Sequence, residues 1–450
     1  MLEVLSLKQL KKWTLYVLMA VLFVSTVAAG LPQQAKAAEN EDNLGLDAGA
    51  AILVDAATGE ILYEKNADKL MGVASMSKMM TEYIVLEAIK EGKISWDQKV
   101  KINNYIHRLS GAPGLSNIGL TEGEEYTVKE LYQAMGIFSG NAATVALAEL
   151  IAGTEKNYIN VMNEKAEKLG LKDYKFVNAS GLNNSDLLGN YPAGSETDEN
   201  EMSAKTVATL AYHLLNDYPE VLETSGMPRL KFRDGRTYDN FNWLLPSLVF
   251  GYKGADGLKT GSTDYAGYNV TATAKRGDQR IIAVIMKGET KNSRFTEATK
   301  LLDYGFNNFT SEEILPAGYT VKGNETVKVT KGKEDSVKIQ TSDAVNLVIK
   351  KEDKENYVAK LVLDKKKLNS KGELAAPVKK GDKVGYITLE TKDGNAVPFL
   401  TSDGSEKASV DVVAAETVEK ANWFVLAMRG VGSFFANIWD SVSSTVKGWF

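Results

Sequence analysis

Residues 257–287, GLKTGSTDYAGYNVTATAKRGDQRIIAVIMK, carry a dense pattern of β-branched residues separated by glycine-containing turns. The pattern predicts three adjacent strands at Gly257–Thr263, Tyr268–Arg276 and Arg280–Lys287. Gly277-Asp278 predicts the tight turn between the last two strands, because glycine adopts the positive φ that a hairpin turn requires. We therefore expect an antiparallel sheet in this part of the chain.

The rest of the chain surrounds this sheet with helices and a second domain. A hairpin is predicted over residues 51–63, followed by helices at Ser75–Lys90, Val128–Met135, Ala142–Ile151 and Ser203–Asn216. Strands, then helices, then strands indicate an α+β architecture for residues 38–310. From residue 313 onward Val, Thr and Lys alternate between turns, which predicts a separate, small all-β domain at 311–413.

Composition excludes several kinds of site. The 450-residue chain has a net charge of −5, two histidines and no cysteine. The acidic balance gives no reason to expect a nucleic-acid partner. A structural zinc site or a thiol nucleophile is not expected either, and no metal or cofactor is predicted.

The N-terminus has the pattern of an export signal. Lys8, Lys11 and Lys12 precede an apolar run at Trp13–Ala29, and Ala35-Lys36-Ala37 follows as a cleavage site. We therefore predict that residues 1–37 are a signal peptide and that the protein is exported. The alternative is an uncleaved segment that stays in the membrane as an anchor.

The C-terminal segment, residues 416–450, is predicted to be an amphipathic helix. Its apolar residues recur at steps of three or four, at Phe424, Met428, Val431, Phe435, Ile438, Val442, Val446 and Trp449. Arg429, Asp440 and Lys447 interrupt the run and argue against a spanning helix. A helix lying in the membrane interface fits better, and it would anchor the protein at the outer face of the cytoplasmic membrane. The alternative is a helix that docks on the protein's own domains.

A serine and a lysine one helical turn apart form the first of three motifs, Ser75-Met76-Ser77-Lys78. Ser75 stands where a polar loop enters an apolar helix, and Lys78 falls on the same face. A desolvated lysine can act as the base that a serine nucleophile needs. The motif is weak alone, since Ser444 and Lys447 match it too, and Ser75 could simply cap the helix.

The second and third motifs are each unique in the chain. In Ser139-Gly140-Asn141, Asn141 could merely cap a helix. In the functional interpretation, the Ser139 hydroxyl lies against Lys78 as a proton relay and Asn141 holds a substrate amide. In Lys259-Thr260-Gly261, Lys259 and Thr260 could meet a terminal carboxylate at a strand edge, with glycine allowing close approach. The alternative is an ordinary surface turn.

Several longer segments carry a family resemblance: residues 74–81 (ASMSKMMT), 176–182 (FVNASGL), 257–263 (GLKTGST) and 266–269 (AGYN). With the three motifs in order, the chain resembles the low-molecular-mass penicillin-binding proteins of type 5, the D-alanyl-D-alanine carboxypeptidases of Bacillus-like bacteria. The resemblance implies a penicillin-binding and β-lactamase-like catalytic domain at 38–310. It covers essentially the whole chain, including the all-β domain and the amphipathic anchor.

The resemblance also implies roles for individual residues. Ser75 would be the acylated nucleophile, Lys78 its base, and Ser139 with Asn141 the second catalytic element. Lys259 and Thr260 would bind the terminal carboxylate, and backbone N–H groups of Ser75 and Ser262 would form the oxyanion hole. The implied substrate-binding group also contains Gly261, Thr263 and Arg294.

The expected activity is removal of the terminal D-alanine from peptidoglycan stem peptides that end in D-Ala-D-Ala, with β-lactams as covalent inhibitors. A β-lactamase is the enzymatic alternative, since it shares the three motifs. Glu196 and Asn200 have the spacing of a β-lactamase deacylation element, which we interpret as coincidence. A penicillin sensor or cell-wall-binding protein without turnover is the non-enzymatic alternative.

Overall fold

The computed structural model describes residues 44–351, 353–392, 397–401 and 409–428. The predicted signal peptide at 1–37 and residues 429–450 of the predicted C-terminal helix lie outside these ranges.

A five-stranded antiparallel sheet forms the centre of the first domain. Its order is β10 (Ala255–Thr263), β11 (Gly267–Arg276), β12 (Gln279–Gly288), β1 (Ala50–Asp55) and β2 (Ile61–Lys65). The three strands predicted within 257–287 are therefore confirmed, and β11 and β12 turn at Gly277-Asp278. β10 is an edge strand of this sheet, so its outer side is free to pair with an extended peptide.

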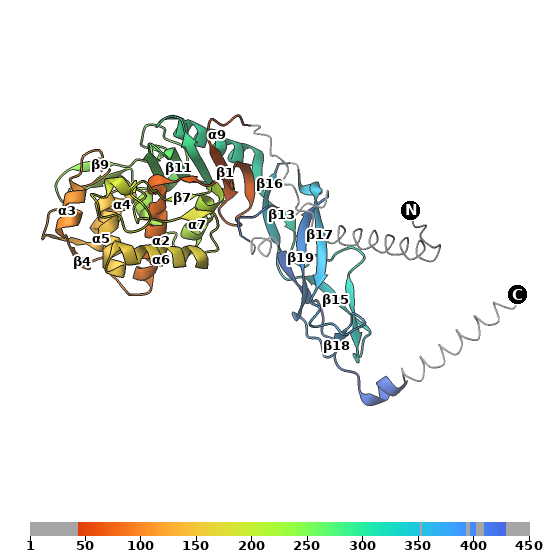
Figure 1. Cartoon of the computed structure of the whole chain (residues 1–450). Coiled ribbons are helices and arrows are strands. Elements are labelled where there is room, and N and C mark those ends of the chain that lie inside the picture. The colour runs from red at the N-terminus through yellow and green to blue at the C-terminus, as the bar shows by residue number, and fades with distance from the viewer. Residues whose placement is uncertain (1–43, 352, 393–396, 402–408, 429–450) are drawn as a thin grey trace, which may run out of the picture. The chain divides into compact units, whose positions relative to one another are not determined.

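The two faces of the sheet are buried against different helices (Figure 1). On β12, Ile282, Val284 and Met286 point into the larger core, which the helical region between β2 and β10 covers. Ile281, Ala283 and Ile285 alternate with them and pack in a second core that contains α9 (Ser293–Asn308). A strand buried on both faces is apolar throughout, which is why this run lacks a polar alternation.

Seven helices lie between β2 and β10 in the described chain: α2 (Lys78–Lys90), α3 (Asn104–Ser110), α4 (Val128–Phe138), α5 (Asn141–Ala152), α6 (Glu155–Lys168), α7 (Ala204–Asp217) and α8 (Val221–Ser225). Several begin at side-chain caps. Thr127 and Glu130 form a capping box at α4, and the Ser203 hydroxyl accepts from the Thr206 N–H at α7. A 3₁₀ turn, η1 (Ala74–Ser77), precedes α2 and carries Ser75.

Short elements complete this domain. They are the strands β3 (Met71–Gly72), β4 (Lys99–Lys101), β5 (Glu125–Thr127), β6 (Tyr174–Lys175), β7 (Glu201–Met202), β8 (Arg229–Lys231) and β9 (Thr237–Asp239), with the turn η2 (Asn184–Asp186). They form three small sheets, β3-β7-β6, β4-β5 and β8-β9.

The second domain is all-β, as predicted. Its strands are β13 (Phe309–Leu315), β14 (Thr326–Thr330), β15 (Ser336–Thr341), β16 (Val345–Lys350), β17 (Tyr357–Leu363), β18 (Leu374–Ala375), β19 (Lys383–Thr391) and β20 (Ser409–Ala414), with one 3₁₀ turn, η3 (Lys354–Asn356). β13 pairs with β16, and the others form a sheet in the order β17-β19-β20-β15-β14-β18. Alternate residues such as Val337 and Ile339 fill its core.

The chain after β20 continues within this domain before it turns helical. Val418 is buried and pairs with Val378, and Lys420 pairs with Gly332. The helix of the predicted segment at 416–450 thus begins later than expected, and residues 423–428 are its described part. In the described part of the chain, we find no helix of the length and apolarity that crossing a bilayer requires.

Candidate active site

Ser75 is held against the sheet by the close packing of η1 on β10. A Cβ atom added at Gly261 would lie 2.5 Å from the Val73 carbonyl oxygen and 2.9 Å from the Ser75 backbone nitrogen. Only glycine leaves room for these backbone atoms. The prediction attributed Gly261 to substrate approach, whereas in the structure the turn that carries Ser75 occupies that space.

Lys78 is fully buried and connects three parts of the site. Its Nζ lies 2.8 Å from Ser75 Oγ, 2.7 Å from Asn141 Oδ1 and 2.6 Å from the Ser180 carbonyl oxygen. The expected contact between Lys78 and Ser75 is therefore present. The other two partners are pure acceptors, so they engage two N–H bonds of the amine.

Burial holds the pKa of Lys78 well below its ordinary value, and the positive charge of Lys259 lowers it further. Glu82 opposes this shift more weakly. A neutral lysine amine has two N–H bonds and one lone pair. With both N–H bonds directed at the oxygens of Asn141 and Ser180, the lone pair faces the Ser75 hydroxyl and can take its proton.

Ser139 lies against Lys259 and not, as predicted, against Lys78. Lys259 Nζ donates to Ser139 Oγ at 2.8 Å and to the Thr260 carbonyl oxygen at 3.2 Å. Ser139 ends α4 in a left-handed conformation with φ of 57°. That turn brings its hydroxyl to the lysine on β10, while Asn141 takes the place beside Lys78.

The Asn141 side chain is engaged at both ends by the protein. Its Oδ1 accepts from Lys78, and its Nδ2 donates to the Ser116 carbonyl oxygen at 2.9 Å. Asn141 does not cap α5, because Gly140 is the N-cap residue. The Ser116 carbonyl oxygen therefore competes with a substrate amide for the Asn141 side chain. The loop containing Ser116 carries no motif, so its part in the site was not predicted.

Two buried cations lie along the β10 edge. Burial lowers the pKa of Lys259 to about 8, with Glu82 opposing the shift. Arg294 donates from Nη1 to the carbonyl oxygens of Gly261 and Asn269, both at 3.3 Å, and burial lowers its pKa to about 10. Thr260 follows Lys259 on β10 and is 5% exposed. Such a group can hold an anion with little competition from water.

The last two residues of β10, Ser262 and Thr263, are more exposed than Lys259 and Thr260. Ser262 is exposed. The Thr263 hydroxyl donates to Glu199 Oε2 at 2.7 Å and accepts from the Ala266 N–H at 3.0 Å. Thr263 therefore already has two protein partners in this state, while Ser262 remains accessible.

The turn that presents the Ser180 carbonyl comes from the segment at 176–182. Asn178 Oδ1 accepts from the backbone N–H groups of Ser180 at 3.1 Å and of Gly181 at 2.7 Å. Gly181 has φ of +76°, and a Cβ there would lie 1.9 Å from the Ala74 carbonyl oxygen. No site residue was predicted in this segment, because its contribution to the site is a backbone carbonyl that no motif marks.

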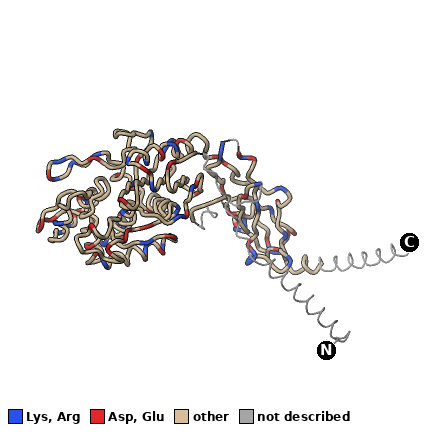
Figure 2. The backbone as a smooth tube through the Cα atoms, turned by 45° about the horizontal axis from the view of Figure 1, so that its top comes forward, with Lys and Arg blue, Asp and Glu red and all other residues tan. Residues whose placement is uncertain are grey.

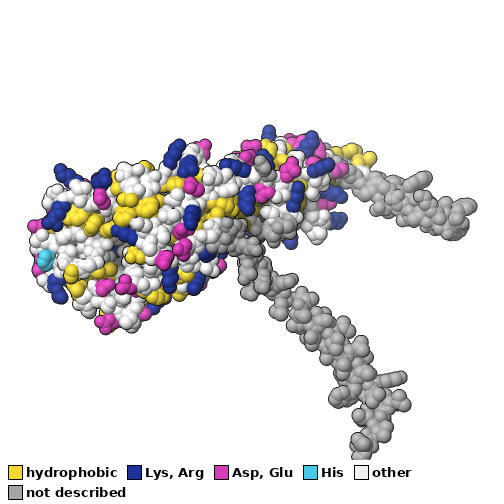
Figure 3. Space-filling view, turned by 90° about the horizontal axis from the view of Figure 1, so that it is seen from above, with side chains coloured by type: hydrophobic (Ala, Val, Ile, Leu, Met, Phe, Trp, Pro, Cys, Tyr) yellow, Lys and Arg dark blue, Asp and Glu magenta, His cyan; other side chains and the backbone are white. Residues whose placement is uncertain are grey.

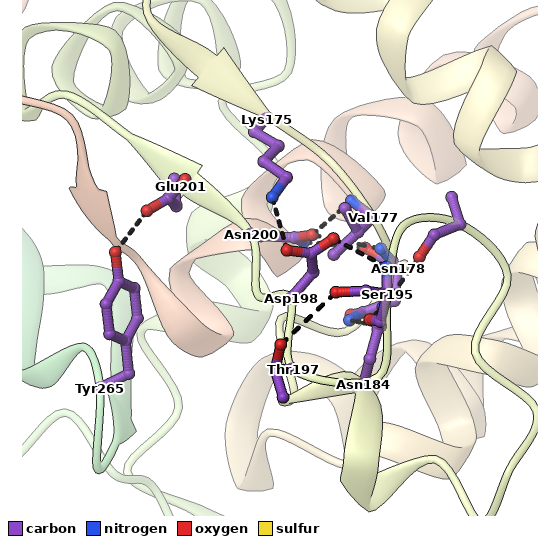
Figure 4. Close-up of polar contacts among 11 residues, drawn as sticks. Lys175, Val177, Asn178, Asn184, Ser195, Thr197, Asp198, Asn200, Glu201 and Tyr265 are labelled. Atoms are coloured by element: carbon purple, nitrogen blue, oxygen red, sulfur yellow. Dashed lines mark hydrogen bonds and ion pairs between the residues drawn. The ribbon is translucent and has the colours of Figure 1, made fainter.

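Asn200 serves this same turn, as Figure 4 shows. Its Oδ1 accepts from the Val177 N–H at 2.7 Å, and its Nδ2 donates to the Asn178 carbonyl oxygen at 2.8 Å. Glu196 is exposed on the neighbouring loop. The β-lactamase-like spacing of Glu196 and Asn200 is therefore explained by a structural asparagine and a surface glutamate.

Comparison with known proteins identifies the family. Residues 34–290 match the Peptidase S11 family of D-alanyl-D-alanine carboxypeptidases. The chain belongs to this carboxypeptidase family. Residues 309–420 match the C-terminal domain of penicillin-binding protein 5. The family and its curated members show that this protein is a hydrolase, a serine-type D-Ala-D-Ala carboxypeptidase.

Curated and solved relatives of this carboxypeptidase cover both domains. The D-alanyl-D-alanine carboxypeptidase DacF of Bacillus subtilis is 36% identical over 70% of this chain and 76% of its own. The crystal structure of a peptidoglycan synthesis regulatory factor, PBP3 from Streptococcus pneumoniae, is 34% identical with a TM-score of 0.68, covering 83% of this chain and 100% of its own. Penicillin-binding protein D2 from Listeria monocytogenes, in its ampicillin-bound form, is 36% identical with a TM-score of 0.50, covering 59% and 99%.

Proposed function

We propose that the carboxypeptidase acts through an acyl-enzyme on Ser75 and takes peptidoglycan stem peptides that end in D-Ala-D-Ala. The observation that carries this proposal is the arrangement around Lys78. Its amine is buried, has two carbonyl-type acceptors and lies 2.8 Å from Ser75 Oγ. A lysine in this setting is a base, because its charged form is disfavoured and its lone pair faces the hydroxyl.

Substrate binding follows from the edge of β10. The peptide would add as an extended strand, with its terminal carboxylate at Lys259, Thr260 and Arg294. The scissile carbonyl oxygen would lie between the backbone N–H groups of Ser75 and Ser262. Because Lys259 and Arg294 are 2% exposed, their attraction for a carboxylate is weakly screened.

The reaction then proceeds in two halves. Lys78 takes the hydroxyl proton as Ser75 Oγ attacks the carbonyl of the penultimate D-alanine. The C–N bond breaks, and the leaving amine takes a proton from Ser139, which Lys259 replaces. A proton from Lys78 returns Lys259 to its cationic form once D-alanine has left. Water then attacks the acyl-enzyme as Lys78 again accepts a proton. The bond between the acyl carbon and Ser75 Oγ breaks, and Lys78 returns that proton to Ser75 Oγ, which restores the starting state.

A β-lactam would enter the same path. Its ring amide takes the place of the scissile bond, and its carboxylate takes the place of the peptide terminus. The Listeria relative, solved with ampicillin, supports this proposal for the present chain. After ring opening the amine stays attached, so the leaving group blocks water and the acyl-enzyme persists.

The test compares two reactions of the chain from residue 38 onward. D-alanine release from diacetyl-Lys-D-Ala-D-Ala and turnover of a chromogenic β-lactam are measured side by side. Fast release with slow β-lactam turnover is expected, and both peptide hydrolysis and penicillin labelling should disappear in Ser75→Ala. Ser444→Ala, which alters the second Ser-x-x-Lys match, is the matched control and should keep both. Rapid β-lactam turnover without release would indicate a β-lactamase, and acylation without either turnover would indicate a sensor.

We propose further that the protein is exported and that its C-terminal segment anchors it to the outer face of the cytoplasmic membrane. Trp423, Phe424 and Met428 begin this segment and are 80%, 58% and 57% exposed. Aromatic side chains that find no partner core favour the headgroup region of a bilayer.

Removal of residues 423–450 tests the anchor, because it leaves the buried Val418 and Ala421 of the β-domain in place. The shortened enzyme should stay in solution when mixed with anionic lipid vesicles, whereas the full mature chain should sediment with them. Both should release D-alanine from the tripeptide at the same rate. Sedimentation of the shortened enzyme would refute the anchor and leave the catalytic proposal intact.

A further inference from the structure

Glu82 is a buried carboxylate that the reaction described above does not use. It follows Lys78 by one turn on α2, so both side chains lie on the same side of the helix. The residue is 1% exposed, and neither carboxylate oxygen has a hydrogen-bond partner among the described residues. Burying an ionisable group in this way is unfavourable unless nearby charges compensate it.

The wall of this space on the α4 side is neutral. A Cβ added at Gly136 would lie 3.1 Å from Glu82 Oε1, so the glycine leaves room for the carboxylate. Tyr132, one turn earlier on α4, is the titratable group of that helix within electrostatic reach of Glu82. Its buried hydroxyl likewise lacks a hydrogen-bond partner in the part of the chain that the structure describes.

The compensating charges are the two lysines of the active site. Burial raises the pKa of Glu82 to about 7, while Lys259 and then Lys78 oppose that rise. Ionisable groups on the other helices packed against α2 have partners elsewhere: Lys165 of α6 pairs with Glu87, and Asp217 of α7 accepts from Tyr83. No charged residue of α5 is among the groups that act on Glu82.

The two lysines respond differently to Glu82. For Lys259, the attraction of Glu82 exceeds the repulsion of Arg294. For Lys78, the repulsion of Lys259 exceeds the attraction of Glu82. One carboxylate can thus favour the ammonium form of Lys259 while Lys78 remains an amine. The two proposed roles need these opposite charge states, because one lysine binds a carboxylate and the other accepts a proton.

We propose that Glu82 is a positioning residue for this reaction, the internal counter-charge that keeps Lys259 cationic beside a neutral Lys78. The inference rests on the roles proposed above for the two lysines. It implies that Glu82 sets the pH range in which the enzyme works, without touching the substrate.

The test is the pH profile of kcat/KM for D-alanine release from diacetyl-Lys-D-Ala-D-Ala, from about pH 5 to about pH 10. The acid limb reports protonation of Lys78, and the alkaline limb reports loss of the Lys259 ammonium. Without the Glu82 charge, both lysines give up their protons more readily. Because Glu82 carries its charge mainly above a pKa of about 7, the alkaline limb in Glu82→Gln should move to lower pH by about one unit, and the acid limb should move in the same direction by less. Glu82→Asp keeps the charge and should restore both limbs toward their wild-type positions.

Glu155→Gln is the matched control. Glu155 is also buried, at 5% exposed, and burial raises its pKa to about 7 too, but it lies on α6 and its Oε1 accepts from the Ala179 N–H. Its limbs should stay where they are in the wild type. A uniform loss of rate in Glu82→Gln, with both limbs unmoved, would overturn the inference and reduce Glu82 to a packing role.

Gly136→Ala serves if Glu82→Gln does not accumulate as a folded protein that a fluorescent penicillin labels. The added methyl group lies against Glu82 Oε1 and disfavours the ionised carboxylate, so both limbs should shift in the same direction by a smaller amount. Unmoved limbs in this variant would again overturn the inference. A wild-type protein that releases no D-alanine would instead refute the proposed function itself, so the two failures are distinguishable.

Discussion

The two domains place their charged residues differently. Both carry Lys, Arg, Asp and Glu along the whole backbone (Figure 2), and on the face drawn in Figure 3 the two signs are interspersed. Inside the first domain, however, Lys78, Glu82, Lys259 and Arg294 are all nearly inaccessible to solvent. Among the described residues of the second domain, Thr341 is the one polar side chain that is buried.

This difference separates a domain that performs chemistry from one that folds by apolar packing alone. Burying four charged groups together is costly, and it persists where their altered proton affinities are useful. The β-domain has no comparable desolvation penalty, since its core consists of alternating Val, Ile and Leu side chains.

Replacing Lys78, the proposed base, should have the largest effect. Lys78→Arg keeps a positive charge but removes the lone pair, because a guanidinium does not deprotonate. Acylation by a fluorescent penicillin should slow by about 10³-fold, the scale of lost general-base catalysis. Lys165→Arg, a lysine on α6 paired with Glu87, is the control and should acylate at the wild-type rate. Near-normal acylation in Lys78→Arg would assign the base to another residue.

A cavity in the β-domain core should cost stability and not chemistry. Ile339 is 2% exposed, so Ile339→Ala should lower the free energy of unfolding of this domain by about 2–4 kcal/mol. Denaturant titration measures this loss, and D-alanine release from the tripeptide should stay within about twofold of wild type. A large drop in release would show that the β-domain supports the active site and would break the contrast between the domains.

Crowding the contact between β10 and η1 should affect stability and rate together. Gly261→Ala forces backbone atoms apart at the Ser75 turn, at a cost of about 1–3 kcal/mol. Thermal unfolding and penicillin acylation should both be impaired. Gly119→Ala, where an added Cβ meets nothing within 4 Å, should leave both unchanged. Wild-type acylation in Gly261→Ala would mean that the turn carrying Ser75 tolerates displacement.

The last substitution concerns Glu60, a buried carboxyl away from Lys78 and Lys259, and should alter only how stability depends on pH. Burial, and secondarily the charge of Asp55, raises the pKa of Glu60 to about 8. Between the unfolded-state value of 4.5 and about 8, the folded protein binds more protons than the unfolded chain, so stability falls as pH rises.

Glu60→Gln should remove this dependence, leaving the variant more stable than wild type at alkaline pH and similar near pH 4.5. Denaturant midpoints across the pH range measure it. Glu313→Gln, an exposed residue on β13, is the control. A wild type whose stability rises with pH over this range would contradict the assignment.

The framework of the fold could be predicted because its signals are local. Turn residues and alternation indicate β11, β12 and β14, and apolar periodicity indicates α2, α5 and α7. Helices α6 and α9 were not predicted, although Ile159 and Met162 on α6, and Ala298 and Leu301 on α9, recur at helical spacing and are buried, so both could have been found from the sequence. The distinction between η1 and α2 depends on packing against β10, which no local pattern records.

In the candidate site, too, local features could be predicted and features that depend on tertiary packing could not. Motif residues could be named, and the contact between Ser75 and Lys78 could be expected from helical spacing. The partner of Ser139 could not, because it depends on the left-handed turn that ends α4. The Ser180 carbonyl and Glu82 lacked a signal for a related reason: a backbone oxygen has no side-chain identity, and a glutamate on a helix is ordinarily solvent-exposed.

The central sheet also determines the order in which the chain can mature. β1 pairs with β12, so that Ala50 lies opposite Met286, and the intervening helices must be made before those strands can meet. Until the chain has been synthesised past β12, the hairpin of β1 and β2 keeps one edge without its partner strand, and such an edge can join another chain. A chain that stops before residue 279 would therefore misassemble with its own copies, even though it already contains Ser75, Lys78, Ser139 and Lys259.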